Sequence, residues 1–271
     1  MYSSKNRVTD RSIRKGLSQK MRRAFSAHKG DDMSKRKQKQ SNQNNNNALV
    51  KNRFELRKIS PLTTNQQKTF TSYNNGTNLV LHGFAGTGKS FISLYLGLEE
   101  IISGSTLYDK VVIVRSVVPS RDVGFLPGNI KEKIKVYEEP YREICNELFE
   151  RGDAYDILKL RNVIEFTTTS YLRGLTFNNA IVIVDELQNM TFQELDTVMT
   201  RMGNQSRIIF CGDFRQTDLT HDRDKSGLMH FLNITKRMNK FDYIEFEKND
   251  IVRSGLVKDY IIKRTELGIV G

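Results

Sequence analysis

The residues Gly83–Ser90 read GFAGTGKS and match the pattern GxxxxGK[ST] in full. Glycines in this pattern let the backbone curl around a phosphate with its N–H groups pointing inward, and the helix that follows adds its positive N-terminal end. Lys89 is expected to reach the β- and γ-phosphates, and the Ser90 hydroxyl to ligate Mg²⁺. The sequence therefore predicts a site for ATP with Mg²⁺.

Two carboxylates follow a second apolar segment. Ala180–Val184 reads as a buried strand, and Asp185 and Glu186 come directly after it. Asp185 is expected to hold the Mg²⁺ shell, and Glu186 to orient or deprotonate the attacking water. An acidic pair after a strand can also simply cap the next helix, but its combination with Gly83–Ser90 favours the catalytic interpretation.

Two glutamines complete the candidate set. Ile208–Cys211 reads as a strand and is followed by Gly212–Gln216, so the Gln216 amide could contact the γ-phosphate or the water and report which nucleotide is bound. The position of Gln66, preferred over Gln67, before the glycine-rich segment resembles that of the Q-motif of helicases, and this resemblance implies that Gln66 reads the adenine edge. The predicted nucleotide contacts are Gln66, Gly83, Phe84, Ala85, Gly86, Thr87, Gly88, Lys89 and Ser90.

Alternating strands and helices must position these residues. Strands are expected at Asn78–His82, Val111–Arg115, Asn162–Thr167, Ala180–Val184, Arg207–Cys211 and Tyr243–Phe246. Helices are expected at Lys89–Ser103, Asn129–Glu150, Thr191–Arg201, Ser226–Met238 and Arg253–Glu266. This alternation predicts an α/β fold with a mostly parallel sheet and helices on both faces, which brings the strand ends to one edge.

Positive charge is concentrated in the first part of the 271-residue chain, whose net charge is +12. Residues 1–60 hold 17 Lys/Arg and 4 Asp/Glu, a balance of +13, while residues 61–271 hold 26 and 27. Residues 1–55 therefore read as a basic, disordered tail, and 56–271 as the folded domain. The clusters Arg11–Arg23 and Lys35–Lys39 could hold a nucleic-acid backbone, or the tail could only improve solubility.

Several classes of protein are not expected. The sequence has no run of 18 apolar residues and no apolar segment behind its basic N-terminus, so it predicts neither a membrane span nor a secretory signal. Cys145 and Cys211 lie far apart and form no metal-binding pattern. This excludes a disulfide framework or a local zinc site and is typical of the reducing cytoplasm.

The blocks GFAGTGKS, DELQ and GDFRQ resemble motifs I, II and III of the superfamily 1 helicase-type ATPases. Longer segments resemble the PhoH family, and within it the phage-encoded PhoH-like branch. They are Val114–Ser116 with Gly124–Gly128, Tyr171–Phe177, Asp185–Met190 and Asp250–Ser254. The resemblance covers residues 61–271 and implies a RecA-like P-loop fold with ATP binding and hydrolysis, in the host bacterial cytoplasm for a phage protein. RNA is then the expected partner, or another single strand.

The sequence departs from the family pattern at two positions. Leu187 replaces the common alanine of DEAQ, at a site expected to be buried and chemically neutral. Leu175 replaces the common arginine of MRGRT, which removes one candidate contact to nucleic acid or to a neighbouring subunit.

One RecA-like domain lacks the second domain that completes the site in such helicases. An arginine must then come from the last helix folding over the nucleotide or from a neighbouring subunit, and the second option, in a closed ring, is expected. The resemblance to the PhoH family implies that this ring is a hexamer. Arg253 is the first choice for this arginine, and Arg115 and Arg173 are candidates for polynucleotide contact. Each could instead be a structural surface residue.

Three functions compete on this evidence. The first is a Mg²⁺-dependent ATPase that acts on or with nucleic acid. The second is an ATP-gated nucleic-acid-binding switch with negligible turnover, against which Glu186 argues. The third is a P-loop kinase, which the GDFRQ block and the basic tail disfavour.

Overall fold

The computed structural model describes residues 54–104, 106–116, 130–214 and 222–269, with side chains omitted at 130–133 and 222–226. The predicted basic tail therefore lies outside the described residues except for its last two positions. Gly124–Gly128 and Gln216 lie outside them as well.

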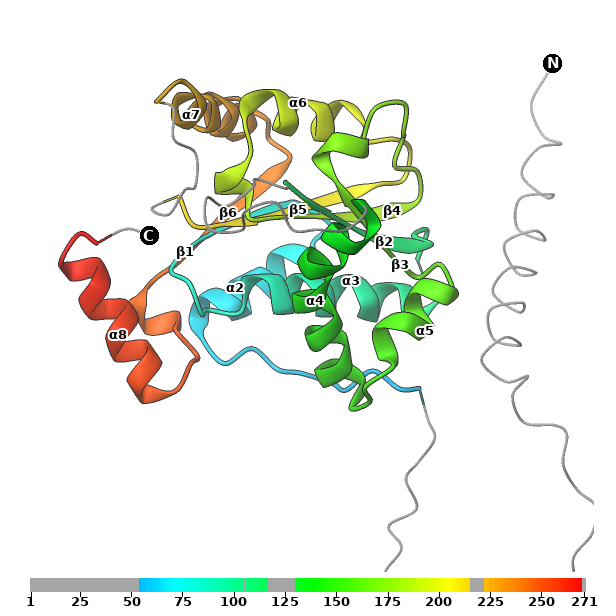
Figure 1. Ribbon diagram of the computed structural model, residues 1–271, viewed down its shortest axis with the longest axis horizontal. Coiled ribbons are helices and arrows are strands. Elements are labelled where there is room, and N and C mark those ends of the chain that lie inside the picture. The colour runs from blue at the N-terminus through cyan, green and yellow to red at the C-terminus, as the bar shows by residue number, and fades with distance from the viewer. Residues whose placement is uncertain (1–53, 105, 117–129, 215–221, 270–271) are drawn as a thin grey trace, which may run out of the picture. The chain divides into compact units, whose positions relative to one another are not determined.

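Six parallel strands form one sheet in the order β3-β2-β4-β5-β1-β6 (Figure 1). The strands are β1 Asn78–Gly83, β2 Lys110–Arg115, β3 Ile164–Thr168, β4 Ala180–Asp185, β5 Arg207–Gly212 and β6 Phe241–Phe246. The predicted parallel sheet is thus confirmed, and all of the strand pairings are parallel. Because parallel strands run the same way, their carboxyl ends gather residues from distant parts of the sequence at one edge.

Seven helices lie in the part of the chain that the structure describes. They are α2 Thr64–Asn74, α3 Lys89–Ser103, α4 Ile130–Phe149, α5 Ala154–Leu160, α6 Phe192–Thr200, α7 Asp222–Arg237 and α8 Gly255–Glu266. Short 3₁₀ turns at Thr169–Tyr171, Leu187–Asn189 and Lys248–Asp250 follow β3, β4 and β6.

The two faces of the sheet are covered by different helices, as expected (Figure 1). Strand residues such as Leu79 and Ile181 pack with α2, α3, α4 and α5, while their neighbours Val80 and Val182 pack with α6 and α7. Successive side chains of a strand point to opposite faces, so runs of Val and Ile serve both layers.

Two helices were not predicted, and β3, β6, α7 and α8 begin two or more residues away from the expected positions. Helix α2 buries Gln66, Thr69 and Tyr73, so it has no apolar periodicity to recognise, and α5 has only 7 residues. Strand β3 begins two residues later than expected because Asn162 has a φ of 55° in the turn that precedes it. Helix α8 begins at Gly255, so Arg253 precedes the helix instead of starting it.

Cys145 on α4 and Cys211 on β5 are both buried free thiols, in agreement with the expectation of no disulfide. Among the described helices, none is long and apolar enough to cross a membrane.

Candidate active site

The glycine-rich segment leaves the carboxyl end of β1 and turns sharply into α3. Gly83, Gly86 and Gly88 have φ values of 117°, 73° and 83°, which L side chains rarely adopt. A Cβ at Gly83 would lie only 2.1 Å from the Phe246 carbonyl oxygen, because β6 runs directly beside the turn. The Phe84 N–H donates to the Phe246 carbonyl oxygen at 3.0 Å, which ties the turn to β6. The backbone of this segment therefore makes the sharp turn that its glycines predict.

Lys89 opens α3 and points back into the loop. Its ammonium donates to the carbonyl oxygens of Gly83 and Phe84 at 3.0 and 2.8 Å. Burial lowers the pKa of Lys89, and the carboxylates of Asp213, Asp185 and Glu186 oppose that shift. Helix α3 has no side-chain cap, so the N–H groups of its first turn and the Lys89 charge face the same place, which suits a phosphate group.

The Ser90 hydroxyl meets the carboxylate at the end of β4. Ser90 Oγ donates to Asp185 Oδ1 at 2.8 Å, and Asp185 is 6% exposed. A hydroxyl and a carboxylate beside a phosphate loop are the hard oxygen donors that Mg²⁺ prefers, together with phosphate oxygens. In the described ranges no cluster of three or more His, Cys, Asp or Glu side chains forms a metal site by itself. The residues thus fit Mg²⁺ held jointly with a nucleotide.

Glu186 lies beside Asp185 in an unusual backbone conformation. Its φ is 54°, in the left-handed region that non-glycine residues seldom occupy. Burial and the neighbouring Asp185 charge raise the pKa of Glu186, while a hydrogen bond from Gln188 and the charges of Arg115 and Lys89 lower it. The net shift is upward, which makes this carboxylate a stronger proton acceptor than an ordinary glutamate.

Gln188 joins the DELQ and GDFRQ blocks. Its Nε2 donates to Glu186 Oε2 at 2.5 Å, and its Oε1 accepts from the backbone N–H of Asp213 at 3.0 Å. The sequence assigned this glutamine no role of its own. Gln216, which was given the reporting role, lies outside the described residues, so that prediction stays a prediction.

Gln66 contacts the phosphate loop directly. Its Nε2 donates to the Thr87 carbonyl at 3.1 Å, and its Oε1 accepts from the Leu62 N–H at 2.7 Å. The side chain is 4% exposed. In this arrangement Gln66 supports the loop from the N-terminal end of α2, and the predicted reading of adenine stays a prediction.

Arg253 lies over the phosphate loop of its own chain. A Cβ at Gly86 would lie 2.9 Å from Arg253 Cγ, and the Val252 N–H donates to the Gly86 carbonyl at 3.1 Å. This in-chain placement was one of the two options left open by the sequence, but an arginine from a neighbouring subunit was expected.

A buried carboxylate holds that C-terminal segment in place. Asp250 Oδ2 accepts from Asn65 Nδ2 at 2.7 Å and from the Glu247 N–H at 2.8 Å. Burial alone would raise the pKa of Asp250, but hydrogen bonds from Thr63 and Asn65 outweigh it and lower the pKa. This latch, Asn65–Asp250, joins α2 to residues 247–253. The sequence did not predict this contact, because Asp250–Ser254 was singled out only by its resemblance to a family motif.

The two other arginines lie in different surroundings. Arg115 ends β2 opposite Asp185 in the sheet register, and its guanidinium lies 5.6 Å from the Tyr137 ring centroid. Its charge also acts on Glu186 and Asp185, and its predicted contact with a polynucleotide stays a prediction. Arg173 is exposed between the exposed side chains of Tyr171 and Leu175. Leu187 is fully buried, as expected.

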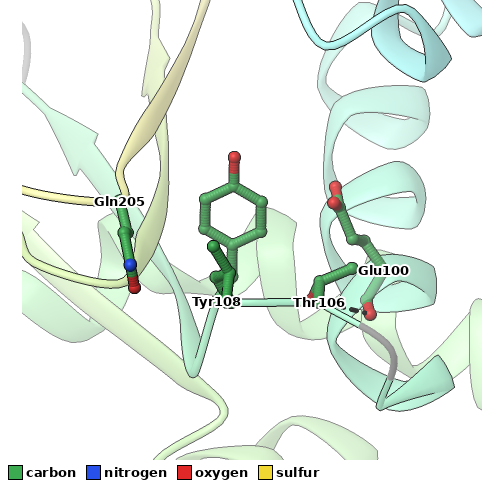
Figure 2. A pocket seen from close by; sticks show the side chains of 5 residues that line it. Glu100, Thr106, Tyr108 and Gln205 are labelled. Atoms are coloured by element: carbon green, nitrogen blue, oxygen red, sulfur yellow. Dashed lines mark hydrogen bonds between the residues drawn. The ribbon is translucent and has the colours of Figure 1, made fainter. Parts of the chain in front are cut away.

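A cavity of about 270 Å³ lies elsewhere in the fold. Figure 2 shows the Tyr108 side chain between Gln205 and Glu100, with Thr106 nearby. Its residues precede β2 and β5 or belong to the end of α3, so it lies at the amino edge of the sheet, opposite the phosphate loop. It contains none of the predicted site residues.

Curated proteins with similar sequences come from several bacteria. The PhoH-like protein of Synechocystis sp. is 35% identical over 177 residues, which are 65% of this chain and 53% of that protein. The PhoH-like protein of Bacillus subtilis is 33% identical over 180 residues, 66% of this chain and 55% of that protein. Protein PhoH of Escherichia coli K12 is 35% identical over 176 residues, 64% and 49% of the two chains. The chain thus spans about half the length of these relatives.

Two solved Pif1 structures match this chain at low sequence identity. Pif1 helicase from Candida albicans is 15% identical with a TM-score of 0.40, and covers 78% of this chain and 44% of its own. Bacteroides Pif1 in complex with ADP-AlF4 is 14% identical with a TM-score of 0.38, and covers 79% and 48%.

The family model described as PhoH-like protein matches residues 58–264, a range that contains the phosphate loop, the Asp185–Glu186 pair and the segment with Arg253. The chain belongs to the PhoH-like family of P-loop proteins.

Proposed function

We propose that this chain is a Mg²⁺-dependent ATPase that acts with RNA or another single-stranded nucleic acid. The observation that carries the proposal is the contact of Ser90 with Asp185 beside the phosphate loop, with Glu186 next in sequence. When bound, Mg²⁺ would neutralise charge on the β- and γ-phosphates, held by Ser90 and Asp185. Lys89 and the first N–H groups of α3 would bind the phosphate oxygens.

Glu186 is the group that would accept a proton from water. Its pKa is raised by burial and by Asp185, and Gln188 restrains its carboxylate, so it is both basic and oriented. A left-handed residue at such a position is typical of functional sites that hold backbone strain. These features support turnover over the alternative of an ATP-gated switch.

Glu186→Gln tests the proposal. An amide cannot accept the proton, so steady-state phosphate release should fall by about 10²–10⁴-fold while ATP still binds. Glu245→Gln, an exposed carboxylate on β6, is the matched control and should hydrolyse ATP at the parent rate. Parent-like hydrolysis by Glu186→Gln would refute its role, and a parent protein without turnover would favour the switch.

The nucleic-acid partner is supported by residues at the carboxyl edge of the sheet. Tyr171 and Arg173 are exposed just after β3, and an aromatic ring beside an arginine suits base stacking and phosphate contact. Arg173→Ala should weaken binding of single-stranded RNA and lower its salt dependence. Arg237→Ala, on the exposed end of α7 before β6, is the control. Equal binding by the two variants would remove Arg173 from the interface.

The basic tail is a second proposed contact. Its two clusters, Arg11–Arg23 and Lys35–Lys39, would each neutralise phosphates and release counterions. Deletion of residues 1–50 should leave ATP binding unchanged and flatten the salt dependence of RNA binding by about 0.7 per lost phosphate contact. An unchanged slope would mean that the tail only aids solubility.

A homo-oligomeric ring, hexameric by family resemblance, is proposed as the assembly. Helix α8 contributes no buried residue, and it exposes Leu256 and Tyr260, apolar groups of the kind that form subunit contacts. The position of Arg253 over its own Gly86 favours action on the nucleotide of the same chain. Mixing the inactive variants Lys89→Ala and Arg253→Ala tests whether Arg253 acts within its own chain or on a neighbouring subunit. ATPase activity is regained only if the arginine is supplied by the neighbouring subunit.

We also propose that the protein works in the cytoplasm, in agreement with its two free thiols. A phage-encoded origin would make this the cytoplasm of the host bacterium.

A further inference from the structure

A buried tyrosine hydroxyl contacts the oxygen of the Asp185 carboxylate that Ser90 does not. Tyr141 Oη on α4 donates to Asp185 Oδ2 at 2.8 Å, while Ser90 Oγ on α3 donates to Oδ1 at the same distance. Each carboxylate oxygen thus has a different donor from a different helix. Together the two contacts fix the rotation of the carboxylate.

The Tyr141 side chain has little freedom to choose another partner. It is 1% exposed, and its ring lies 5.7 Å from the Phe166 ring of β3. The Arg115 guanidinium lies beside its hydroxyl and over Tyr137, one helical turn earlier on α4. A phenol is protonated at neutral pH, so the hydroxyl acts as the donor to Asp185.

We infer that Tyr141 is a positioning residue that holds Asp185 in the orientation required for Mg²⁺, and so sets the affinity of the nucleotide site for the metal. The inference rests on the proposed Mg²⁺–ATP site. Mg²⁺ demands a near-ideal octahedral arrangement of ligands, so a carboxylate that rotates freely holds it, or its bound water, less well. Loss of a hydrogen bond behind a metal-binding side chain costs about 10–100-fold in metal affinity.

The same contact makes α4 part of the metal site, although α4 carries none of the residues of the phosphate loop. Asp185 is held by α3, which begins at the loop, and by α4 together. A shift of α4 relative to β4 would therefore change metal affinity without touching the nucleotide.

Tyr141→Phe removes only the hydroxyl and keeps the ring against Phe166. The test measures binding of a fluorescent, non-hydrolysable ATP analogue without metal and across a Mg²⁺ titration. The variant should bind the analogue like the parent without Mg²⁺, and should need about 10–100-fold more Mg²⁺ to reach the tighter affinity. Tyr155→Phe, a fully buried tyrosine of the same core on α5, is the matched control and should titrate like the parent.

Two further results decide the inference. In the Asp185→Asn background, Tyr141→Phe should cause no additional change in the Mg²⁺ titration, because the group it positions is gone. Thermal unfolding of each variant shows that it is folded. The inference would be overturned if Tyr141→Phe gave the same Mg²⁺ titration as the parent. It would also be overturned if the parent bound the ATP analogue with an affinity that does not depend on Mg²⁺. A parent that binds with Mg²⁺ but does not hydrolyse ATP would refute the proposed ATPase and leave Tyr141 as assigned.

Discussion

The two sides of the nucleotide site are built differently. On one side, Ser90, Asp185 and Tyr141 form a buried network between strand ends and two helices of the core. On the other, Arg253 is exposed on a connecting segment, held by the contact of Val252 with Gly86 and by the latch Asn65–Asp250.

This difference suggests separate roles for the two sides, one in binding the nucleotide and the other in adjusting to it. The first side is held by hydrogen bonds from two helices to the end of β4, so its geometry is set before a nucleotide arrives. The C-terminal side depends on a few hydrogen bonds near the surface, and such segments open at lower free energy than a core. We therefore expect phosphate and metal binding to depend on the first side, and adjustment to the nucleotide to depend on the second.

Among the tests that compare these two sides, the largest effect is expected at the phosphate loop itself. Lys89→Ala removes a buried cation that faces the phosphates, and the ATPase rate should fall by roughly 10²–10³-fold, the scale for losing one preorganised donor to developing charge. Phosphate release and ATP binding are measured together. Lys110→Ala, which breaks the partly exposed ion pair with Glu165 at the start of β2, should retain parent activity.

A smaller effect is expected from the latch. Asp250→Asn removes the charge that Thr63, Asn65 and the Glu247 N–H recognise, and should cost about 1–3 kcal/mol in the free energy of unfolding. ATP binding should change little, while the ATPase rate falls as Arg253 loses its position. If Asp250→Asn and the parent have equal ATPase rates and equal free energies of unfolding, the latch does not hold the C-terminal side of the site.

The latch also predicts a pH dependence. The pKa of Asp250 is lower in the folded protein than its ordinary value of 3.8, so the carboxylate stabilises the fold above that pH. This contribution disappears as the pH falls through the folded-state pKa. The stability difference between parent and Asp250→Asn, followed by thermal unfolding, should thus be largest near neutral pH and shrink in acid below about pH 4.

The smallest effect concerns Gln188. Its hydrogen bond lowers the pKa of Glu186, so Gln188→Met should raise that pKa further. A general base works only when deprotonated, so the acidic limb of the pH–rate profile should move to higher pH. Gln193→Met, on α6, is the control. A shift to lower pH, or none, would contradict this role of Gln188.

The sequence predicted the buried side of the site more completely than the other side. Strand ends in a parallel sheet share an edge, so Lys89, Ser90 and Asp185 could be placed together from their spacing and their strands. Tyr141 lies in a predicted amphipathic helix whose pattern gives no sign of which inward side chain meets a carboxylate. Only the position of α4 in the folded protein, which brings Tyr141 to the end of β4, decides that.

The other features that the sequence did not predict depend on polar side chains and on contacts between distant parts of the chain. Helix α2 packs against the sheet through Gln66, Thr69 and Tyr73, a pattern that hydrophobic periodicity does not detect. The partners Asn65 and Asp250 are 185 residues apart, and nothing local to either one indicates the other. The contact of Arg253 with its own Gly86 likewise depends on the path of the chain after β6.

The buried thiols make the folded protein a reporter of its own opening. Cys145 follows Tyr141 by one turn of α4 and is fully buried, with a pKa raised to about 12 by burial, while Cys211 lies inside β5. A neutral alkylating reagent reacts with the thiolate of an accessible cysteine, so neither residue is labelled while its element stays packed. The labelling rate at Cys145 then measures how often α4 leaves its contact with Asp185, and the labelling rate at Cys211 measures how often the sheet itself opens. Comparing the two with and without nucleotide needs no engineered probe.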